Sequence, residues 1–370
     1  MKNKKYILSP CGTSLLTNQV KDNDGRNLVF KYANEKNRDE IPHDDKNKLE
    51  KLIQYVSKLI EEADCQQAKK MSAELNGIIQ IYGGSIPDDT DFHLLLSTDT
   101  WLGEETAKLV EKWLKLKNKN IIISIHRQCD LQTKDISAFQ LSLSELVKRF
   151  NEELDRYSKS GYKIIFNLTG GFKSVQGFLQ SIANFYADEV VYIFETSSEL
   201  LRIPRLPIKL DALSIMENKL MVFRKLSLGL EIEKNQIERI PETLLFTFDN
   251  QTTLSPWGEI LWGQSKRDIY SKKLFAPPID KIRYSNKFES DVSGLEPDRR
   301  VQINERIDQL AKYFTNGDNP NSLDFKKLKG KAMLPSTHEI DAWSDQDAKR
   351  IFGHYEDDIF VIDKLDKGLH

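Results

Sequence analysis

The stretch Phe166–Phe194, FNLTGGFKSVQGFLQSIANFYADEVVYIF, places a helical pattern between two apolar runs. The runs, 164–168 and 190–194, have the length of buried strands. Between them, apolar residues recur every three or four positions, as on one face of a helix. They are Val175, Phe178, Leu179, Ile182, Phe185 and Tyr186. The stretch predicts a strand–helix–strand unit with a right-handed crossover, which implies a parallel sheet.

Two glycine-containing turns follow predicted strands of this sheet. Gly170 and Gly171 lie between the strand at 164–168 and the helix, and Gly12-Thr13-Ser14 follows a strand expected at 5–8. Glycines let a ligand approach the backbone, and the first N–H groups of a helix favour anions. Neither turn matches GxxxxGKS/T or GxGxxG, and each alone fits an ordinary tight turn. Two such turns in one sheet favour a site for a phosphate-bearing ligand.

Length and charge limit the possible classes of protein. The 370 residues exceed one ordinary core, so two or three domains are expected. Apolar residues make up 39% and charged residues 30%, which is typical of a soluble globular protein. The 54 basic and 56 acidic side chains give a net charge of −2. A protein-wide electrostatic attraction to nucleic acid is therefore excluded, and any such contact must be local.

Cysteine usage and the N-terminus point to a compartment. Cys11, Cys65 and Cys129 show no CxxC spacing, so neither a disulfide framework nor a zinc site is indicated. The first ten residues hold too few apolar side chains for a signal peptide. No run approaches the ~18 apolar residues that span a bilayer. We expect a cytoplasmic protein with no membrane partner and no cofactor.

Strand and helix patterns alternate through the first 205 residues, which predicts a doubly wound parallel sheet. Residues 19–45 are expected to be a polar surface excursion, and residues 98–100 could line the same cleft as the two turns. The expected strands are 5–8, 78–82, 93–97, 121–125, 164–168 and 190–194. The expected helices are 49–60, 101–114, 143–154 and 175–186.

The pattern changes at LRIPRLPIKL, residues 201–210, where two prolines indicate a domain boundary near residue 205. A helix is expected at 210–225, followed by a hairpin around Asp249-Asn250. Residues 206–268 thus suit either a winged helix-turn-helix-like connector or a structural linker domain. Residues 269–370 predict a helix at 301–314 and then short strands at 323–328, 337–343, 349–354 and 359–365. A helix followed by an antiparallel meander is an α+β arrangement.

The two glycine turns resemble a known family. SPCGTSLLTN (residues 9–18) and NLTGGFKSVQGFLQSIANFYADEVVYIFE (167–195) resemble the signature turns of CARF domains, the CRISPR-associated Rossmann-fold sensors, over about residues 1–205. The resemblance implies a homodimer that binds one cyclic oligoadenylate, most commonly cyclic tetra-adenylate, across its two-fold axis. An aspartate at Gly170 or Gly171 is then expected to abolish binding and leave the fold intact. The implied ligand-binding residues are Gly12, Thr13, Ser14, Thr169, Gly170, Gly171 and Lys173.

The last 50 residues carry a second set of polar groups. His338, His354 and His370 lack the HxxxH and HExxH spacings of metal sites. With Arg350 and lysines 326, 327, 329 and 331, they fit a metal-independent ribonuclease, in which a base activates a 2′-OH and cations stabilise the phosphorane. The alternative is a solvated sheet face, since acidic residues outnumber basic ones in this segment. His370 would transfer protons and Arg350 would bind the scissile phosphate.

Residues 325–370, FKKLKGKAMLPSTHEIDAWSDQDAKRIFGHYEDDIFVIDKLDKGLH, resemble RelE-type mRNA interferases. The shared order is a helix, LKG and three strands with an arginine opening the middle strand. The resemblance covers about residues 270–370 and implies Arg350 as phosphate ligand, with Lys367 and His370 as C-terminal cationic residues. His338 and Lys329 complete the candidate catalytic set. Two departures are Glu339 and Asp341, which replace lysines of the family, and the absence of its C-terminal tyrosine.

Together the patterns predict a multidomain protein: a Rossmann-like CARF sensor (1–205), a winged-helix-like connector (206–268) and an α+β RelE-like domain (269–370). The predicted activity is cyclic-oligoadenylate-activated cleavage of mRNA in type III CRISPR antiviral defence, with the ribosome as a further partner. Two alternatives stay open: a ligand-gated DNA-binding transcription regulator, and a ring nuclease that degrades the signal molecule.

Overall fold

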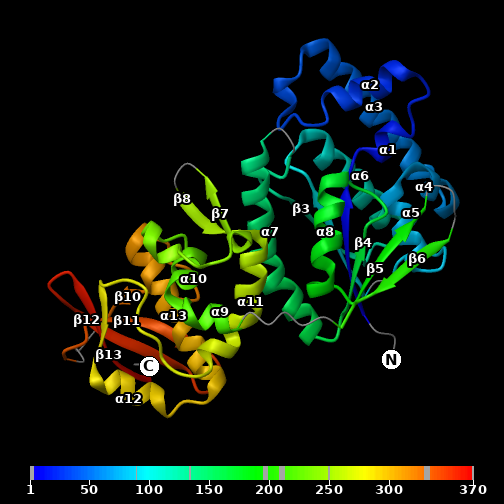
Figure 1. Cartoon of the computed structure of the whole chain (residues 1–370). Helices are drawn as coiled ribbons and strands as arrows, with labels where there is room; N and C mark the ends of the chain where they lie inside the picture. Colours follow the sequence, from blue (N-terminus) through cyan, green and yellow to red (C-terminus); the bar gives the residue numbers. More distant parts are fainter. Residues whose placement is uncertain are drawn as a thin grey trace. The chain divides into compact units, whose positions relative to one another are not determined.

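The computed structural model describes residues 4–88, 90–132, 135–194, 199–207, 213–248, 251–328 and 334–368. The chain forms two compact units, Met1–Lys209 (unit 1) and Leu210–His370 (unit 2), each with its own sheet (Figure 1). The division lies four residues after the boundary expected near 205. No corresponding division falls at 268, so a separate connector domain stays a prediction.

A six-stranded sheet forms the centre of unit 1, in the order β3-β2-β1-β4-β5-β6. Strands β1 to β5 run parallel, as the sequence predicts, and β6 pairs antiparallel with β5 at one edge. The strands are β1 (Lys5–Cys11), β2 (Phe92–Ser97), β3 (Ile122–Arg127), β4 (Lys163–Asn167), β5 (Glu189–Ile193) and β6 (Leu200–Pro204).

The strand order reverses between β1 and β4, which are neighbours at the middle of the sheet. From β1 the chain continues to β2 and β3 at one edge, and from β4 it continues to β5 and β6 at the other. Ligands of open α/β sheets bind beyond the carboxyl ends of the strands at such a reversal. The turns that follow β1 and β4 are therefore the place to look for a site.

Helices cover both faces of this sheet. Ile165 of β4 packs with Ile81 of α5 (Ala73–Ile81), whereas the next residue, Phe166, contacts Phe150 of α7 (Ile136–Lys159), with ring centroids 6.0 Å apart. Successive strand side chains point to opposite faces, so α5 and α7 lie on opposite sides. Every helix in the described ranges is too short or too polar to cross a lipid bilayer. The other helices of unit 1 are α1 (Ser14–Thr17), α2 (Asn23–Lys31), the 3-10 helix η1 (Arg38–Glu40), α3 (His43–Glu62), α4 (Cys65–Met71), α6 (Trp101–Lys117) and α8 (Lys173–Tyr186).

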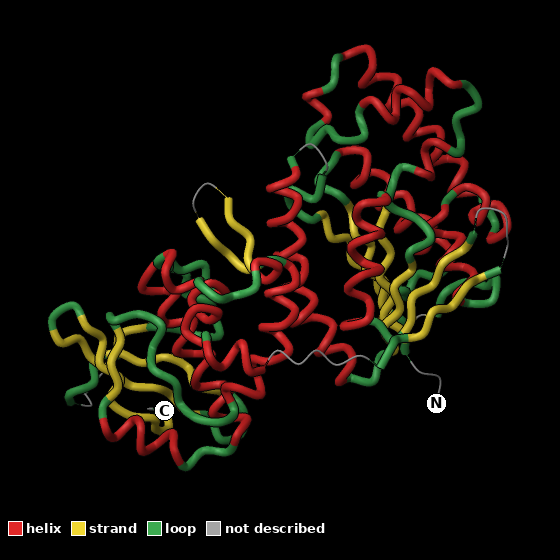
Figure 2. Tube along the Cα trace, viewed as in Figure 1, coloured by secondary structure: helices red, strands yellow, loops and turns green. Residues whose placement is uncertain are grey.

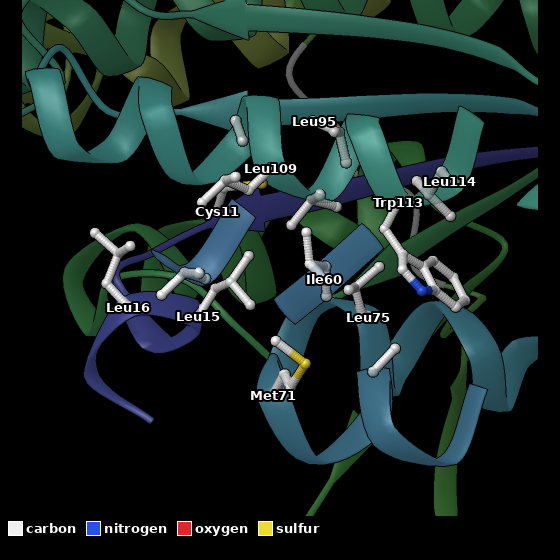
Figure 3. Close-up of a cluster of buried hydrophobic side chains, with 14 of the residues drawn as sticks. Cys11, Leu15, Leu16, Ile60, Met71, Leu75, Leu95, Leu109, Trp113 and Leu114 are labelled. Carbon is white, nitrogen blue, oxygen red and sulfur yellow. The ribbon is translucent and has the colours of Figure 1, made fainter. Parts of the chain in front are cut away.

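A buried apolar cluster connects the end of β1 to α3, α5 and α6 (Figure 3). Cys11 ends β1 and Leu15 lies in α1, on either side of the β1 turn, and they share the cluster with Leu75 of α5 and Trp113 of α6. Trp113 is fully buried, and its indole N–H donates a hydrogen bond of 3.0 Å to the carbonyl of Ala63. Burying each large apolar side chain contributes ~1.5–3 kcal/mol, so this cluster holds the β1 turn in a fixed position.

Three sequence expectations for unit 1 are wrong or incomplete. Residues 78–82, expected as a strand, belong mostly to helix α5, which Ser72 caps by accepting a hydrogen bond from the Leu75 amide at 3.2 Å. A short apolar run fits a buried helix as well as a strand, because neither shows a polar face. Strand β6 was not predicted, although its proline is tolerated at a sheet edge. The 19–45 segment contains α2, whose Val29 is fully buried, so it is more than a surface excursion.

The first half of unit 2 is a set of helices with a hairpin. The hairpin predicted around 249–250 is confirmed, with β7 (Leu245–Phe248) antiparallel to β8 (Gln251–Leu254), while its tip lies outside the described residues. The helix predicted at 210–225 is observed as two shorter helices, and helix α11 was not predicted. The helical elements are α9 (Leu213–Asn218), α10 (Leu220–Ser227), the 3-10 helices η2 (Lys234–Ile237) and η3 (Glu242–Leu244), and α11 (Pro256–Tyr270).

The second half of unit 2 contains a five-stranded sheet in the order β10-β11-β12-β13-β9 (Figure 2). The antiparallel meander expected after the helix is confirmed for β10 to β13, and β9, which was not predicted, pairs parallel with β13. One sheet face, including Ile340, Ile351 and Leu365, packs with helix α13. The elements are β9 (Ile282–Tyr284), α12 (Asn286–Ser293), α13 (Pro297–Asn316), β10 (Lys326–Lys327), β11 (His338–Trp343), β12 (Lys349–Glu356) and β13 (Ile359–Lys367).

A buried polar network joins the two halves of unit 2. Arg224 of α10 is fully buried and forms an ion pair with Asp308 of α13, which also accepts a hydrogen bond from the Tyr270 hydroxyl of α11. Asn304 of α13 donates to the carbonyls of Tyr270 and Lys273, at 3.1 and 2.9 Å. The buried Arg224–Asp308 ion pair thus joins α10, which precedes residue 268, to α13, which follows it.

Candidate functional site

The two glycine turns predicted to bind a ligand lie against each other. Strands β1 and β4 pair in register, so the turns that follow them meet at the reversal of strand order. A Cβ atom at Gly12 would lie 3.1 Å from the Cα atom of Gly171. Gly171 itself has φ +102° and a Cβ there would lie 2.9 Å from Pro10, so this position also requires glycine. The structure therefore brings the predicted residues of both turns together.

A buried carboxylate, Glu74 of α5, lies behind these turns. Its Oε1 accepts a hydrogen bond from the Gly12 amide at 2.9 Å, and its Oε2 accepts from the hydroxyls of Ser14 and Ser72 at 2.8 and 2.7 Å. The side chain is fully buried, and a Cβ at Gly170 would lie 2.4 Å from its carboxyl carbon. Glu74 therefore fixes the β1 turn and is in contact with the β4 turn.

The position of Glu74 changes the interpretation of the predicted ligand residues. The Gly12 amide and the Ser14 hydroxyl, expected to hold a phosphate, already bind a carboxylate. A second anion beside that carboxylate is electrostatically unfavourable. The structure also argues against the expectation that an aspartate at Gly170 leaves the fold intact, because a Cβ there would already lie 2.4 Å from the carboxyl carbon of Glu74. These groups hold the turn from behind, so the groups left to face a ligand would be those further along the β4 turn.

The outer part of the site is the beginning of helix α8. Its first residue, Lys173, is exposed, the helix has no side-chain N-cap, and its first turn contains no acidic residue. Free N–H groups at a helix N-terminus favour an anion, and a lysine strengthens that preference. Gln176 holds the preceding turn by donating to the Gly170 carbonyl at 2.7 Å. The Thr169 hydroxyl oxygen is buried without a hydrogen-bond partner.

Asn167 at the end of β4 connects this turn to Glu74 and β1. Its side-chain amide donates to the hydroxyl of Ser9 and to the backbone carbonyl of Glu74, both at 3.1 Å. Its side-chain oxygen accepts from the Thr169 amide at 3.4 Å. Through Asn167 the turn is thus bonded to β1 and to α5, which holds it in one shape. Neither Asn167 nor Glu74 was singled out from the sequence, although Glu74 is the one charged residue of the mainly apolar helix AELNGIIQI, which is a signal of a specific role.

A charged network occupies the neighbouring strand end, where residues 98–100 were expected to line the cleft. Asp99 forms ion pairs with Lys36 at 3.1 Å and with Arg127 at 2.9 Å. Asp99, Cys129 and Asp130 have a spacing that could hold a metal ion, but Lys36 also pairs with Asp130. Hydrogen bonds from Lys36 to these carboxylates raise its pKa, so it stays charged. Cations of the protein therefore already balance this acidic group.

In unit 2, Arg350 is the second residue of β12 and faces carboxylates. Its Nη1 lies 2.9 Å from Asp341, 3.3 Å from Glu339 and 3.6 Å from Asp324. Glu339 and Asp341 are the residues that replace lysines in the predicted family pattern, and they lie opposite Phe352 and Arg350 on the neighbouring strand. The charge of Arg350 is thus offset within the protein, and a phosphate has to compete with these carboxylates to bind it.

The other predicted catalytic residues do not surround Arg350 in the part of the chain that the structure describes. His338 lies in an aromatic cluster, stacked on Phe325 with ring centroids 5.2 Å apart and edge-on to Tyr355 at 5.3 Å. Burial, together with the charge of Lys327, lowers the pKa of His338. Lys367 is exposed at the end of β13, and Lys329 and His370 lie outside the described residues.

His354 of β12, which was not included in the predicted catalytic set, is bonded to two carboxylates. Its Nδ1 lies 3.0 Å from both carboxylate oxygens of Asp363, and its Nε2 lies 3.3 Å from Glu356. Asp363 also accepts a hydrogen bond of 2.7 Å from the buried Ser336 hydroxyl. Burial alone would lower the pKa of His354, but the hydrogen bonds to Asp363 and Glu356 outweigh burial and raise it.

A comparison with protein families covers the segment that contains the β4 turn. Residues 69–206 match the model of a CRISPR-associated protein family (Cas_APE2256). The matched segment contains Glu74, the β4 turn and the start of α8, and it ends shortly after β6. The match supports a CRISPR-associated protein and a role in CRISPR defence. No curated protein matches the chain.

Proposed function

We propose that unit 1 is a homodimeric sensor that binds cyclic oligoadenylate, with cyclic tetra-adenylate as the first ligand to test. The bound ligand would activate unit 2 as a metal-independent endoribonuclease. Unit 2 would cut mRNA, on the ribosome, through attack of a ribose 2′-OH on the neighbouring phosphate. The protein would act in antiviral CRISPR defence by stopping translation.

The observation that carries this proposal is the position of the two glycine turns. They meet at the reversal of strand order in the unit 1 sheet, and the second of them lies within the segment that matches a CRISPR-associated family. The start of α8 offers uncapped N–H groups and the exposed Lys173, which suit a phosphodiester. A cyclic ligand on a two-fold axis would use both copies of this site, so we expect one ring per homodimer.

The architecture of unit 2 supports the ribonuclease part of the proposal. A helix precedes an antiparallel meander, and an arginine near the start of the middle strand lies on the sheet, in the order that the sequence resemblance implies. In this proposal Arg350 binds a phosphate after RNA displaces Asp341 and Glu339, with Lys329, Lys367, His338 and His370 as the other candidate groups. Arg350→Ala should therefore lose cleavage and keep ligand binding.

Activation needs a ligand that prefers the active arrangement of the dimer. Shifting an equilibrium from 1:99 to 99:1 takes ~5.5 kcal/mol of differential binding free energy. A cyclic polyanion that contacts two copies of the α8 start would gain this energy only when both copies adopt the binding arrangement. The ligand thereby couples the two sensor units, and through them the two nuclease units.

The deciding experiment combines translating ribosomes, mRNA and the full-length protein, with and without cyclic tetra-adenylate, and reads cleavage by toeprinting. We expect cuts only with the ligand, and equally in EDTA. Salt-sensitive binding to duplex DNA with intact RNA would favour the transcription regulator, with the β7–β8 hairpin as its wing. Loss of the ligand itself, catalysed by the protein without residues 210–370, would favour the ring nuclease.

A further inference from the structure

His354 has the surroundings of a proton-transfer group. Its Nδ1 is fixed by Asp363, which is in turn held by the Ser336 hydroxyl. A carboxylate on one ring nitrogen fixes the orientation of an imidazole and leaves the other nitrogen to exchange protons. That other nitrogen, Nε2, lies beside Glu356, whose side chain is half exposed. The ring is therefore fixed on its inner side by Asp363, while its outer nitrogen contacts a half-exposed carboxylate.

The register of β12 places His354 on the same sheet face as Arg350. Side chains alternate along a strand, so Arg350, Phe352 and His354 point to one face and Ile351 and Gly353 to the other. Ile351 packs in the core with α13, and a Cβ at Gly353 would meet the ring of Phe360, also in the core. The register of β12 and β13 shifts by one residue between Phe352 and Gly353, and the extra residue on β13 is Asp363. This bulge brings Asp363 beside His354. Arg350 and His354 thus share the face that is not covered by α13.

We propose that His354, oriented by Asp363, is the general acid of the unit 2 ribonuclease. This assignment rests on the proposed function and gives the acid role to a histidine that the sequence analysis considered but did not include in the candidate catalytic set. Arg350, about 13 Å away along the strand at ~3.3 Å per residue, would bind a phosphate adjacent to the scissile one. Asp363 acts as a positioning residue, because it contacts the imidazole rather than the RNA.

The proposed step is a transesterification. The ribose 2′-oxygen forms a bond to phosphorus as its proton passes to a water molecule, and the bond from phosphorus to the 5′-oxygen breaks. The Nε2 proton of His354 goes to that 5′-oxygen, so the products are a 2′,3′-cyclic phosphate and a 5′-hydroxyl. Solvent then reprotonates the imidazole, and no redox change or additional reactant is involved.

Charged groups around His354 favour the protonated imidazole that an acid requires. Asp363 faces it from β13 and Glu356 from its own strand, while Arg283 of β9 pairs with Glu356 and partly offsets that carboxylate. The hydrogen bonds to Asp363 and Glu356 raise the pKa of His354. His338, by contrast, has a lowered pKa and lies among aromatic rings. Of these two histidines, His354 is better suited to donate a proton near neutral pH.

The test compares full-length wild type with His354→Gln, Asp363→Asn and Asp358→Asn. Asp358 is exposed in the β12–β13 turn and provides the same acid-to-amide change away from His354. Cleavage of mRNA on translating ribosomes is measured with saturating cyclic tetra-adenylate across the neutral pH range, with melting temperatures as a check on folding. We expect His354→Gln to cleave ~10²–10⁴-fold more slowly, the usual loss for an acid or base. Asp358→Asn should match wild type.

Asp363→Asn separates a catalytic role from a structural one. Without the carboxylate the pKa of His354 falls, so the pH above which cleavage declines should shift downward, whereas a structural role would lower the rate equally at every pH. This variant decides the question if His354→Gln fails to fold. Cleavage at the wild-type rate by His354→Gln, or an unshifted pH profile of Asp363→Asn, would overturn the assignment of His354 and leave the proposed function standing. Absence of cleavage by ligand-saturated wild type would overturn the proposed function and the assignment together.

Discussion

Substituting Gly170 with alanine should destabilise unit 1 through a contact with Glu74. The added Cβ would lie 2.4 Å from the carboxyl carbon of Glu74, about 1 Å closer than ordinary van der Waals contact. Glu74 cannot move away freely, because it is buried and accepts three hydrogen bonds. Gly170 does not have positive φ, so alanine adds no backbone strain and the collision alone determines the cost.

The expected loss combines two effects. Forcing one extra carbon into a packed interior costs ~1–3 kcal/mol, and displacing Glu74 enough to break one charge-assisted hydrogen bond adds ~1.5–3 kcal/mol. Gly177→Ala is a matched control in the following helix, where an added Cβ meets nothing within 4 Å. Alanine there should stabilise α8 by ~0.5–1 kcal/mol. The two glycine-to-alanine changes should thus act in opposite directions.

Equilibrium unfolding in urea measures both changes, and a double-mutant cycle with Glu74→Ala tests the cause. In the Glu74→Ala background the Cβ at position 170 has free space, so Gly170→Ala should cost at least ~1 kcal/mol less than in wild type. Calorimetry with cyclic tetra-adenylate then shows whether the shape of the turn matters for binding. An equal cost of Gly170→Ala in both backgrounds would refute the contact as its origin.

Three further changes test other features. Burial lowers the pKa of His93 from 6.5 to about 4, so the neutral form is favoured in the folded state. Unit 1 should keep its stability above pH ~6.5 and lose about 3 kcal/mol as the pH falls toward 4, and His93→Gln should reduce that loss in urea titrations. Asp308→Ala leaves Arg224 as an unpaired buried charge and should lower the free energy of unfolding by ~3–5 kcal/mol, as measured by guanidinium denaturation. Changing both residues to apolar ones should cost less, and equal losses would contradict the ion-pair explanation. Lys173→Glu changes an exposed side chain, so cyclic tetra-adenylate should bind more weakly at low salt with an unchanged melting temperature; unchanged affinity would remove the start of α8 from the site.

The sequence predicts the elements that have a clear hydrophobic period. Strands β4 and β5 were expected from continuous apolar runs and helix α8 from apolar residues every three or four positions, and the meander of unit 2 from its short strand patterns. Helix α5 was taken for a strand because its residues are buried on nearly all sides, so its sequence lacks the polar face that would indicate a helix. Helix α11 was missed because its apolar residues, concentrated around Trp262, do not repeat at a regular spacing.

The glycine turns of the candidate site were predicted, but their chemical surroundings were not. Glu74 is 62 residues from Gly12 in the chain, and only the packing of α5 against β1 brings them together. The carboxylates around Arg350 were named from the sequence as departures from a family pattern. Their consequence, an arginine whose charge is already offset, depends on the register of β11 and β12. Long-range pairing of this kind is set by tertiary structure and leaves no local signal.

The buried pairing of Arg224 with Asp308 determines where the chain can be divided for experiments. A fragment beginning at residue 269 would contain Asp308, Asn304 and Tyr270 but lack Arg224 of α10 and all but the last two residues of α11. A fragment ending at 268 would expose the same arginine without its carboxylate. Each fragment would contain one member of the ion pair without its partner, so neither fragment would reproduce the interior of unit 2. Fragments divided between Lys209 and Leu210 keep the network whole, and are the appropriate material for testing the proposed sensor and the proposed nuclease separately.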